Sequence, residues 1–132
     1  MSVHSKNLNI LLVEDTPALQ LTSKEFLENC GCVVTVAATV AEALEKFNLS
    51  FDGMLTDVGL PDGTGFEVIE HIHQTYPQHS LVIYVYTAYG RDYVEERCAK
   101  AGIQGYFDKP CYQDDIKNFV EAVRDNKRIV AP

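Results

Sequence analysis

The stretch LLVED at residues 11–15 places two acidic side chains directly after an apolar run. That run, residues 10–13, is typical of a short β-strand buried on both of its faces. Glu14 and Asp15 cannot be buried there unpaired without a heavy desolvation cost. The two acids therefore either mark where the strand reaches the surface or form one half of a functional site. The rest of the chain has to decide between these interpretations.

The composition is that of a soluble globular protein with an acidic balance. At 132 residues, we expect one domain over residues 1–132, with its core at about residues 8–126. Acids outnumber bases 19 to 11, which gives a net charge of -8. This balance argues against direct nucleic-acid binding, which needs clustered Lys and Arg, and it is compatible with cation binding.

The sequence also disfavours a membrane protein and a protein with a metal site made of Cys or His. The N-terminal MSVHSKN has no apolar segment, and no run of 18 apolar residues occurs, so we expect no membrane contact and a cytoplasmic location. The four cysteines lack zinc-type spacing and the four histidines do not cluster. A metal site built from Cys or His is therefore not expected.

Apolar strand-like segments alternate with helical patterns along the whole chain. We expect strands at residues 9–13, 33–37, 53–56, 81–86 and 105–107, each followed by an amphipathic helix. The first helix opens at Thr16 and Pro17, and its predicted buried face consists of Leu19, Thr22, Phe26 and Cys30. Strands without polar alternation, separated by helices, indicate a parallel sheet covered on both faces. With right-handed crossovers, this pattern predicts a doubly wound α/β sandwich.

Polar residues stand at the ends of four of these strands. In an open α/β sheet, the functional crevice lies at the carboxyl ends of the strands. The first strand ends in Glu14-Asp15 and the third in Asp57, while Thr87 and Lys109 follow the fourth and fifth. We therefore expect three carboxylates, a hydroxyl and an ammonium group to meet at one edge of the sheet.

Three carboxylates held this close repel one another unless a cation offsets their charge. Oxygen ligands with several retained waters favour Mg²⁺, for which Mn²⁺ can substitute, and no EF-hand pattern for calcium is present. Lys109 is placed to meet a phosphoryl group, and Thr87 could donate a hydrogen bond to it. A carboxylate beside Mg²⁺ and a lysine is a competent nucleophile toward a phosphoryl donor, and the product would be an acyl phosphate.

The loop GLPDGTG, residues 59–65, follows the third strand. Its glycines and Pro61 permit a tight turn that leaves the backbone carbonyl of Gly59 free to act as a metal ligand. The alternative is a plain glycine-rich turn before a helix. The P-loop pattern is missing, and Asp62 is interpreted as a solvated or capping residue.

The segments LLVED, LTDVGLPDGTG, YTA and YFDKP, taken together at these strand ends, resemble the response-regulator receiver domain of two-component signalling. The resemblance extends from about residue 8 to residue 123. It implies a flavodoxin-like (βα)5 fold with strand order 2-1-3-4-5. It also implies a phosphoacceptor that has no kinase activity of its own beyond self-phosphorylation and autodephosphorylation.

The resemblance assigns a role to each site residue. Asp57 would accept a phosphoryl group from a phosphohistidine on a histidine kinase or a histidine phosphotransfer domain. Asp15, Asp57 and the Gly59 carbonyl would bind Mg²⁺, with Glu14 assisting through a water molecule. Lys109 would contact the phosphoryl oxygens. Two departures stand out: many family members have Asp where this chain has Glu14, and Gly59 provides no side chain two positions after the phosphoacceptor.

The resemblance also implies a conformational switch. Thr87 would move toward the phosphoryl group, Tyr106 would turn from an outward to an inward rotamer, and the Lys109–Pro110 peptide would be cis. The output surface would consist of the fourth helix, fifth strand and fifth helix, in a monomer or a phosphorylation-linked homodimer.

Alternative contexts and classes remain open at this point. The chain ends at KRIVAP without a DNA-binding module, which suits a single-domain regulator, whereas EDTPALQ with Gln20 suggests a receiver excised from a hybrid sensor histidine kinase. In the second case the location would be the cytoplasmic portion of a membrane sensor. A small Mg²⁺-dependent phosphatase or phosphotransferase of the haloacid-dehalogenase type would need a DxD pattern where EDT stands. A flavodoxin-like cofactor site would need a phosphate-binding loop after the first strand.

Overall fold

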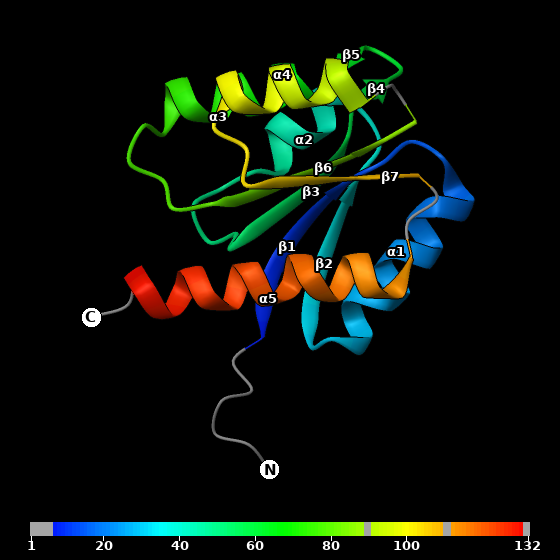
Figure 1. Cartoon of the computed structure of the whole chain (residues 1–132), viewed down its shortest axis with the longest axis vertical. Coiled ribbons are helices and arrows are strands. Elements are labelled where there is room, and N and C mark those ends of the chain that lie inside the picture. Colours follow the sequence, from blue (N-terminus) through cyan, green and yellow to red (C-terminus); the bar gives the residue numbers. More distant parts are fainter. Residues whose placement is uncertain (1–6, 89–90, 110–111, 131–132) are drawn as a thin grey trace.

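A five-stranded parallel sheet forms the centre of the molecule in the computed structural model, which describes residues 7–88, 91–109 and 112–130 (Figure 1). Its strand order is β2-β1-β3-β6-β7. The strands are β1 (Leu8–Val13), β2 (Cys32–Ala37), β3 (Gly53–Asp57), β6 (Val82–Thr87) and β7 (Gly105–Asp108). This order confirms the expected doubly wound arrangement, because β6 and β7 are the fourth and fifth strands of the parallel sheet.

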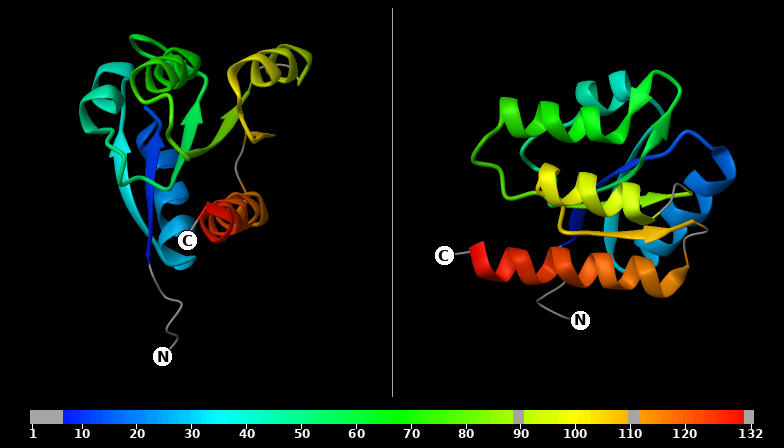
Figure 2. Two further views of the ribbon diagram at one scale, coloured as in Figure 1. Left: turned by 90° about the vertical axis from the view of Figure 1, so that its left-hand side faces the viewer. Right: turned by 45° about the horizontal axis from the view of Figure 1, so that its top comes forward.

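Five helices cover the two faces of the sheet, as the left view of Figure 2 shows. They are α1 (Pro17–Asn29), α2 (Val40–Lys46), α3 (Gly65–Thr75), α4 (Arg91–Ala101) and α5 (Gln113–Val130). Helices α1 and α5 contact each other on one face, while α3 lies between α2 and α4 on the other. In β1, Leu11 and Val13 face the α2–α3 side and Ile10 and Leu12 face the α1–α5 side. This two-sided burial is why the strand reads as an uninterrupted apolar run.

Helix α1 buries the predicted face only in part: Phe26 and Cys30 pack against the core as predicted. Ser23 and Leu27 are its buried residues, whereas Thr22 is exposed and Leu19 is only half-buried. The predicted face was wrong at Thr22 because periodicity favoured an apolar stripe through Leu19 and Phe26. In the structure the buried polar Ser23 takes the central position, close to the hydroxyl of Tyr86 on β6.

The loop after β3 is an antiparallel hairpin made of β4 (Gly59–Leu60) and β5 (Gly63–Thr64). The carboxylate of Asp62 at its tip accepts hydrogen bonds from the backbone N–H groups of Val40 at 2.7 Å and Ala41 at 3.1 Å. These bonds lower the pKa of Asp62 and confirm its interpretation as a cap, here of the first turn of α2. The hairpin is thereby tied to the helix across the sheet edge.

Helix α3 begins directly against the end of β3. Thr64 and Glu67 form a capping box, and the N–H of Gly65 donates to the carbonyl of Val58 at 2.8 Å. A Cβ atom at Gly65 would lie 2.2 Å from the backbone oxygen of Asp57. Only glycine therefore permits the helix to start this close to the strand end.

Two imidazole rings connect α3 with the end of α4. The N–H of Leu81 donates to Nδ1 of His79 at 3.0 Å, so in the neutral ring the proton is on Nε2. That nitrogen lies 2.7 Å from Nδ1 of His73, whose own Nε2 lies 2.6 Å from the carbonyl oxygen of Ala101. Each of these three hydrogen bonds has one donor and one acceptor only while both imidazole rings are neutral.

Within the described part of the chain, the helices are too short or too polar for any of them to cross a membrane.

Candidate functional site

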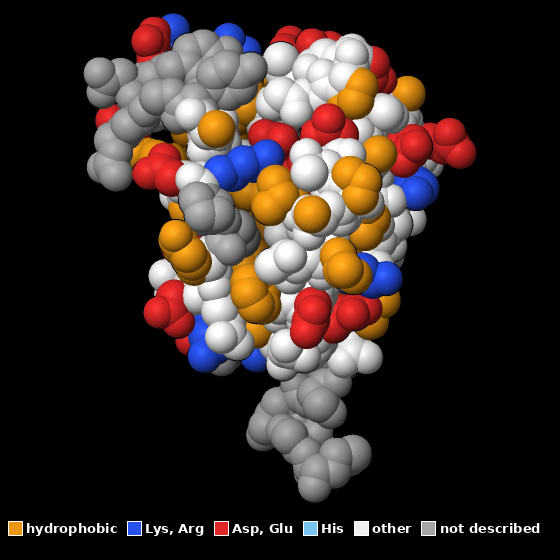
Figure 3. Space-filling view, turned by 90° about the vertical axis from the view of Figure 1, so that its right-hand side faces the viewer, with side chains coloured by type: hydrophobic (Ala, Val, Ile, Leu, Met, Phe, Trp, Pro, Cys, Tyr) orange, Lys and Arg blue, Asp and Glu red, His pale blue; other side chains and the backbone are white. Residues whose placement is uncertain are grey.

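The acidic residues predicted at the strand ends do meet in the structure. Strands β1 and β3 are neighbours with Val13 opposite Thr56, so the residues that follow lie at the same level. Carboxylate oxygens of Glu14, Asp15 and Asp57 all lie within 4.8 Å of one another. Glu14 and Asp57 are buried, whereas Asp15 is exposed. Figure 3 views this side of the molecule and shows acidic and basic side chains close together among hydrophobic ones.

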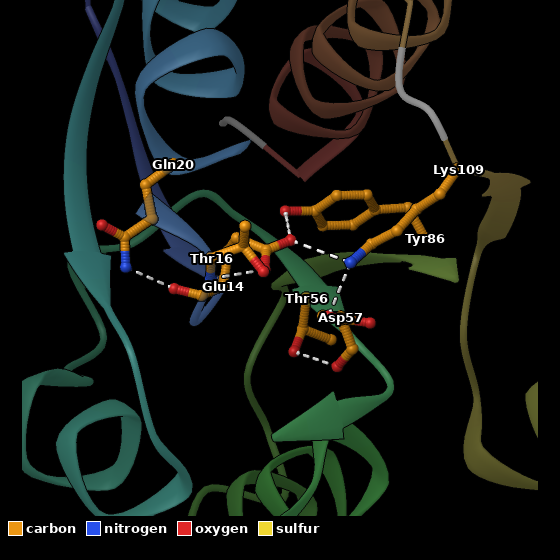
Figure 4. Close-up of polar contacts among 7 residues, drawn as sticks. All are labelled: Glu14, Thr16, Gln20, Thr56, Asp57, Tyr86 and Lys109. Carbon is orange, nitrogen blue, oxygen red and sulfur yellow. Dashed lines mark hydrogen bonds and ion pairs between the residues drawn. The ribbon is translucent and has the colours of Figure 1, made fainter. Parts of the chain in front are cut away.

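Lys109 bridges two of the three carboxylates. Its Nζ lies 2.7 Å from Oδ2 of Asp57 and 3.2 Å from Oε1 of Glu14, as Figure 4 shows. The backbone N–H of Lys109 donates to the carbonyl of Thr87 at 3.0 Å, which anchors the end of β7 to the end of β6. The ammonium group is therefore held between the first and third strands although its own strand is at the sheet edge.

Glu14 is fully buried, and hydrogen bonds surround its carboxylate. Oε1 accepts from the hydroxyl of Tyr86 at 2.7 Å, and Oε2 accepts from the backbone N–H of Thr16 at 2.9 Å. Burial acts to raise the pKa of Glu14, but the Tyr86 and Thr16 bonds and the charge of Lys109 outweigh it and lower the pKa. The side chain of Gln20 holds the backbone in place, because its Nε2 donates to the Glu14 carbonyl at 2.6 Å.

The pKa values of Asp57 and Lys109 are both raised, but for different reasons. Burial, assisted by the charge of Glu14, raises the pKa of Asp57 although Lys109 opposes this. Burial acts to lower the pKa of Lys109, but the bonds and charges of Asp57 and Glu14 outweigh it and raise the pKa. With Asp15 included, three carboxylates face one ammonium group, which leaves two excess negative charges. This donor set suits one divalent, oxygen-preferring cation.

The two predicted switch residues lie on neighbouring strands. Thr87 is buried at the end of β6, one residue after Tyr86, which pairs with Asp57 on β3; Thr87 itself is opposite Asp108 on β7. Tyr106 is half-buried on β7, and its hydroxyl donates to Oε1 of Glu95 on α4 at 2.5 Å. Tyr106 is thus directed toward α4 rather than toward the carboxylates in this structure.

The structure leaves two predictions untested: the Gly59 carbonyl as a metal ligand and the cis peptide after Lys109. Gly59 is the first residue of β4, two residues after Asp57, and it pairs with Thr64 across the hairpin. The role of its carbonyl as a ligand stays a prediction. The predicted cis peptide between Lys109 and Pro110 lies outside the described residues.

Tyr86 is the site residue that the sequence analysis missed. It was interpreted only as part of the expected strand at residues 81–86, yet its hydroxyl binds the buried Glu14. A useful signal was available: a tyrosine in a strand buried on both faces needs a partner for its hydroxyl. The contact joins β6 to the end of β1 across β3.

A doubly wound α/β domain with a lysine-bridged carboxylate cluster at its strand ends defines a class of phosphoacceptor signalling domains. This chain belongs to the response regulator receiver domain family, whose model matches residues 10–121. It is therefore a receiver domain of two-component systems, and the solved structures that resemble it include CheY-like receiver domains.

The relatives described below are 31% to 39% identical to the chain over the residues that align with it. An uncharacterized 14.6 kDa protein of Leptolyngbya boryana is 31% identical over 104 residues, which are 78% of this chain and 79% of that protein. The aerobic respiration control sensor protein ArcB of Escherichia coli is 39% identical over 75 residues, 56% of this chain but only 10% of ArcB. The receiver domain of HemR from Leptospira biflexa, in its non-phosphorylated form, has a TM-score of 0.79 at 31% identity, covering 89% of this chain and 94% of that one.

Proposed function

We propose that Asp57 is the residue of this receiver domain that accepts the phosphoryl group. The observation that carries this proposal is the 2.7 Å contact between Lys109 Nζ and Asp57 Oδ2 inside a cluster of three carboxylates. A buried aspartate with a lysine on one oxygen and an open acidic neighbour has the charge balance that phosphoryl transfer needs. Asp15 is exposed beside it, so the site opens to solvent and to a phosphodonor.

The donor is a phosphohistidine on a histidine kinase or a histidine phosphotransfer domain. A carboxylate oxygen of Asp57 forms a bond to phosphorus while the bond between phosphorus and the imidazole nitrogen breaks. The leaving imidazole takes a proton from solvent, and the product is an acyl phosphate on Asp57. Lys109 then binds a phosphoryl oxygen in place of the carboxylate, and Thr87 donates its hydroxyl hydrogen to another.

Asp15, Asp57 and the carbonyl of Gly59 would hold Mg²⁺, and Glu14 would contribute through a water molecule. Mn²⁺ can substitute, because its oxygen preference and coordination are similar. The bound cation would supply charge neutralisation for the transferring phosphoryl group. The excess negative charge of the three carboxylates over Lys109 supports the assignment of a divalent cation to this site.

Phosphorylation would then alter the α4-β7-α5 surface. The phosphoryl group adds about -1.5 to -2 charges, which draw Thr87 and Lys109 toward it. Tyr106 would leave Glu95 on α4 and turn inward, so that the outward contact now present marks the unphosphorylated state. The two arrangements would form a two-state element that the phosphoryl group biases.

The biological context divides into two proposals. The relative in Leptolyngbya boryana is similar in size to this chain, which favours a single-domain regulator that acts by binding a partner. The chain spans about a tenth of ArcB, which favours a receiver within a longer sensor protein. In either case the output is protein binding, by a monomer or by a phosphorylation-linked homodimer.

Intact-mass spectrometry tests the central assignment. The protein is incubated with Mg²⁺ and a small-molecule phosphodonor, and the wild type should gain a single phosphoryl adduct. Asp57→Asn should gain none, whereas the control Asp62→Asn should gain the adduct as the wild type does, because Asp62 caps α2 instead. A wild type that gains no adduct, or an Asp57→Asn variant that gains it equally, would contradict the proposal.

A further inference from the structure

Tyr86 puts a polar group into a mainly apolar layer. Its ring lies in the cluster between the sheet and helices α1 and α5, together with Leu12, Ile116 and Phe119, and the whole residue is fully buried. A buried phenol hydroxyl costs free energy unless it is hydrogen-bonded. A phenylalanine would fill the same space without that cost, so the hydroxyl calls for a specific explanation.

The explanation lies in its contact with Glu14. The hydroxyl donates to Oε1 at 2.7 Å, while the backbone N–H of Thr16 binds Oε2, so the carboxylate is held at both oxygens. Ser23 on α1 is a second polar group in the same layer. Its Oγ is buried and has no hydrogen-bond partner of ordinary geometry among the described residues, yet it lies close enough to the phenol to affect the Tyr86 pKa.

We propose that Tyr86 is a positioning residue for the metal site, whose hydroxyl holds the Glu14 carboxylate in the one orientation that supports Mg²⁺ binding. This inference rests on the proposed function, because it assumes that the carboxylate cluster binds Mg²⁺. Glu14 is one methylene longer than aspartate, and that extra length lets its carboxylate reach the Tyr86 hydroxyl. The two residues are thus a matched pair, joined across β3.

The phenol ring also lies beside the other partner of Asp57. Lys109 Nζ is 5.2 Å from the centre of the Tyr86 ring, so the ring supports the ammonium group while the hydroxyl binds the carboxylate. Tyr86→Phe keeps the ring and removes only the hydroxyl. The substitution therefore separates the effect on Glu14 from the effect on Lys109.

A double-mutant cycle measured by calorimetric titration with Mg²⁺ tests the proposal. The four proteins are the wild type, Tyr86→Phe, Glu14→Asp and the double variant, all freed of metal beforehand. Removing a residue that orients a ligand weakens metal binding by about 10-fold or more. We expect a loss of this size for Tyr86→Phe in the wild-type background. In the Glu14→Asp background, the same substitution should change the affinity by less than about 2-fold, because the shorter carboxylate no longer reaches the hydroxyl.

Tyr84→Phe is the matched control, since Tyr84 lies two residues earlier on the same strand and packs in the same apolar layer. It should leave the Mg²⁺ affinity unchanged. The thermal midpoint of each metal-free variant shows whether it folds, and a purely structural role for Tyr86 would move this midpoint without moving the affinity.

Three results would overturn the inference: an unchanged affinity for Tyr86→Phe, an equal loss in both backgrounds, or an equal loss for Tyr84→Phe. A wild type that binds no Mg²⁺ would instead overturn the metal site on which the inference rests. The two failures are therefore distinguishable.

Discussion

Lys109 lies between the ends of strands that are not its neighbours: its Nζ is 2.7 Å from Oδ2 of Asp57 on β3, although β6 separates β3 from its own strand β7. The lysine thereby joins Asp57 to the strand that contains Tyr106. A change in charge at Asp57 can reach the α4-β7-α5 surface through this one side chain. The remaining contacts of the site then determine how tightly the carboxylates and the ammonium group are held.

Removing the charge of Lys109 should destabilise the metal-free protein. Its side chain is only 18% exposed, and Lys109→Met would leave Asp57 and Glu14 without their shared cation. Breaking a buried ion pair on one side costs about 3 kcal/mol, which urea unfolding in the presence of a chelator can measure. Lys100→Met is the control, because Lys100 pairs with Glu96 on the surface. Its cost should stay below about 1 kcal/mol, and equal losses for the two variants would refute the buried role of Lys109.

Mg²⁺ should stabilise the folded protein through the acidic cluster. A ligand that binds only the native state at about 100 times its Kd raises the free energy of unfolding by about 2.7 kcal/mol. We expect this gain in the wild type and its near loss in Asp15→Asn, since Asp15 belongs to the cluster. The exposed Glu28 on α1 provides the control Glu28→Gln, which should retain the gain. Thermal unfolding with and without Mg²⁺ measures the difference, and a full gain in Asp15→Asn would contradict the assignment.

Gly65→Ala should impair phosphorylation of the folded protein. The added Cβ would lie 2.2 Å from the backbone oxygen of Asp57, so Asp57 or the start of α3 must move, at a cost of about 3 kcal/mol. Gly105→Ala is a matched control, because its Cβ would instead meet the ring of Tyr84 at 2.6 Å. Both variants should unfold at lower denaturant concentrations. Only Gly65→Ala should slow adduct formation by at least about 10-fold, and comparable slowing in both would show that the effect is not local.

The His73–His79 contact predicts a loss of stability in mild acid. Burial, and then the neighbouring His73, lower the pKa of His79 from its ordinary 6.5. The unfolded chain therefore binds the proton more readily than the folded one, so this contribution is present above pH 6.5 and is lost as the pH falls through the lowered value. Protonation would also put two donors face to face in the link from Leu81 to Ala101.

Thermal unfolding at about pH 7.5 and about pH 5 measures this effect. His79→Gln should show a smaller decrease in midpoint over that interval than the wild type. The exposed His71 on α3 supplies the control His71→Gln, whose decrease should match that of the wild type. Identical decreases in all three proteins would exclude a role for the imidazole pair.

Periodicity and strand ends were sufficient to predict the sheet and the meeting of Glu14, Asp15 and Asp57. The carboxyl ends of parallel strands lie at the same edge of the sheet. Residues that directly follow neighbouring strands are therefore close together, whatever their side-chain rotamers. The hydroxyl of Tyr86 was not predictable in this way, because its contact with Glu14 crosses an intervening strand and depends on the rotamers of both residues. The capping box at Thr64 and Glu67 was visible in the sequence but was not used.

The buried face of α1 shows a second limit of pattern analysis. Helical spacing favoured Leu19 and Phe26, and Thr22 was included because it shares their stripe. The structure turns Ser23 inward instead, close to Tyr86, which a polar residue would not do without a polar neighbour in the core. Ser23 therefore interrupts the predicted apolar stripe, while Phe26 still packs against the core.

Locating the phosphoryl group within the chain tests the central claim most directly. The protein is phosphorylated with a small-molecule donor and Mg²⁺, treated with borohydride to reduce the acyl phosphate to an alcohol, and digested for peptide mass analysis. The account predicts that homoserine replaces aspartate at Asp57 and at no other carboxylate. Reduction at Asp15, Asp62 or any other acid, with Asp57 unchanged, would contradict it.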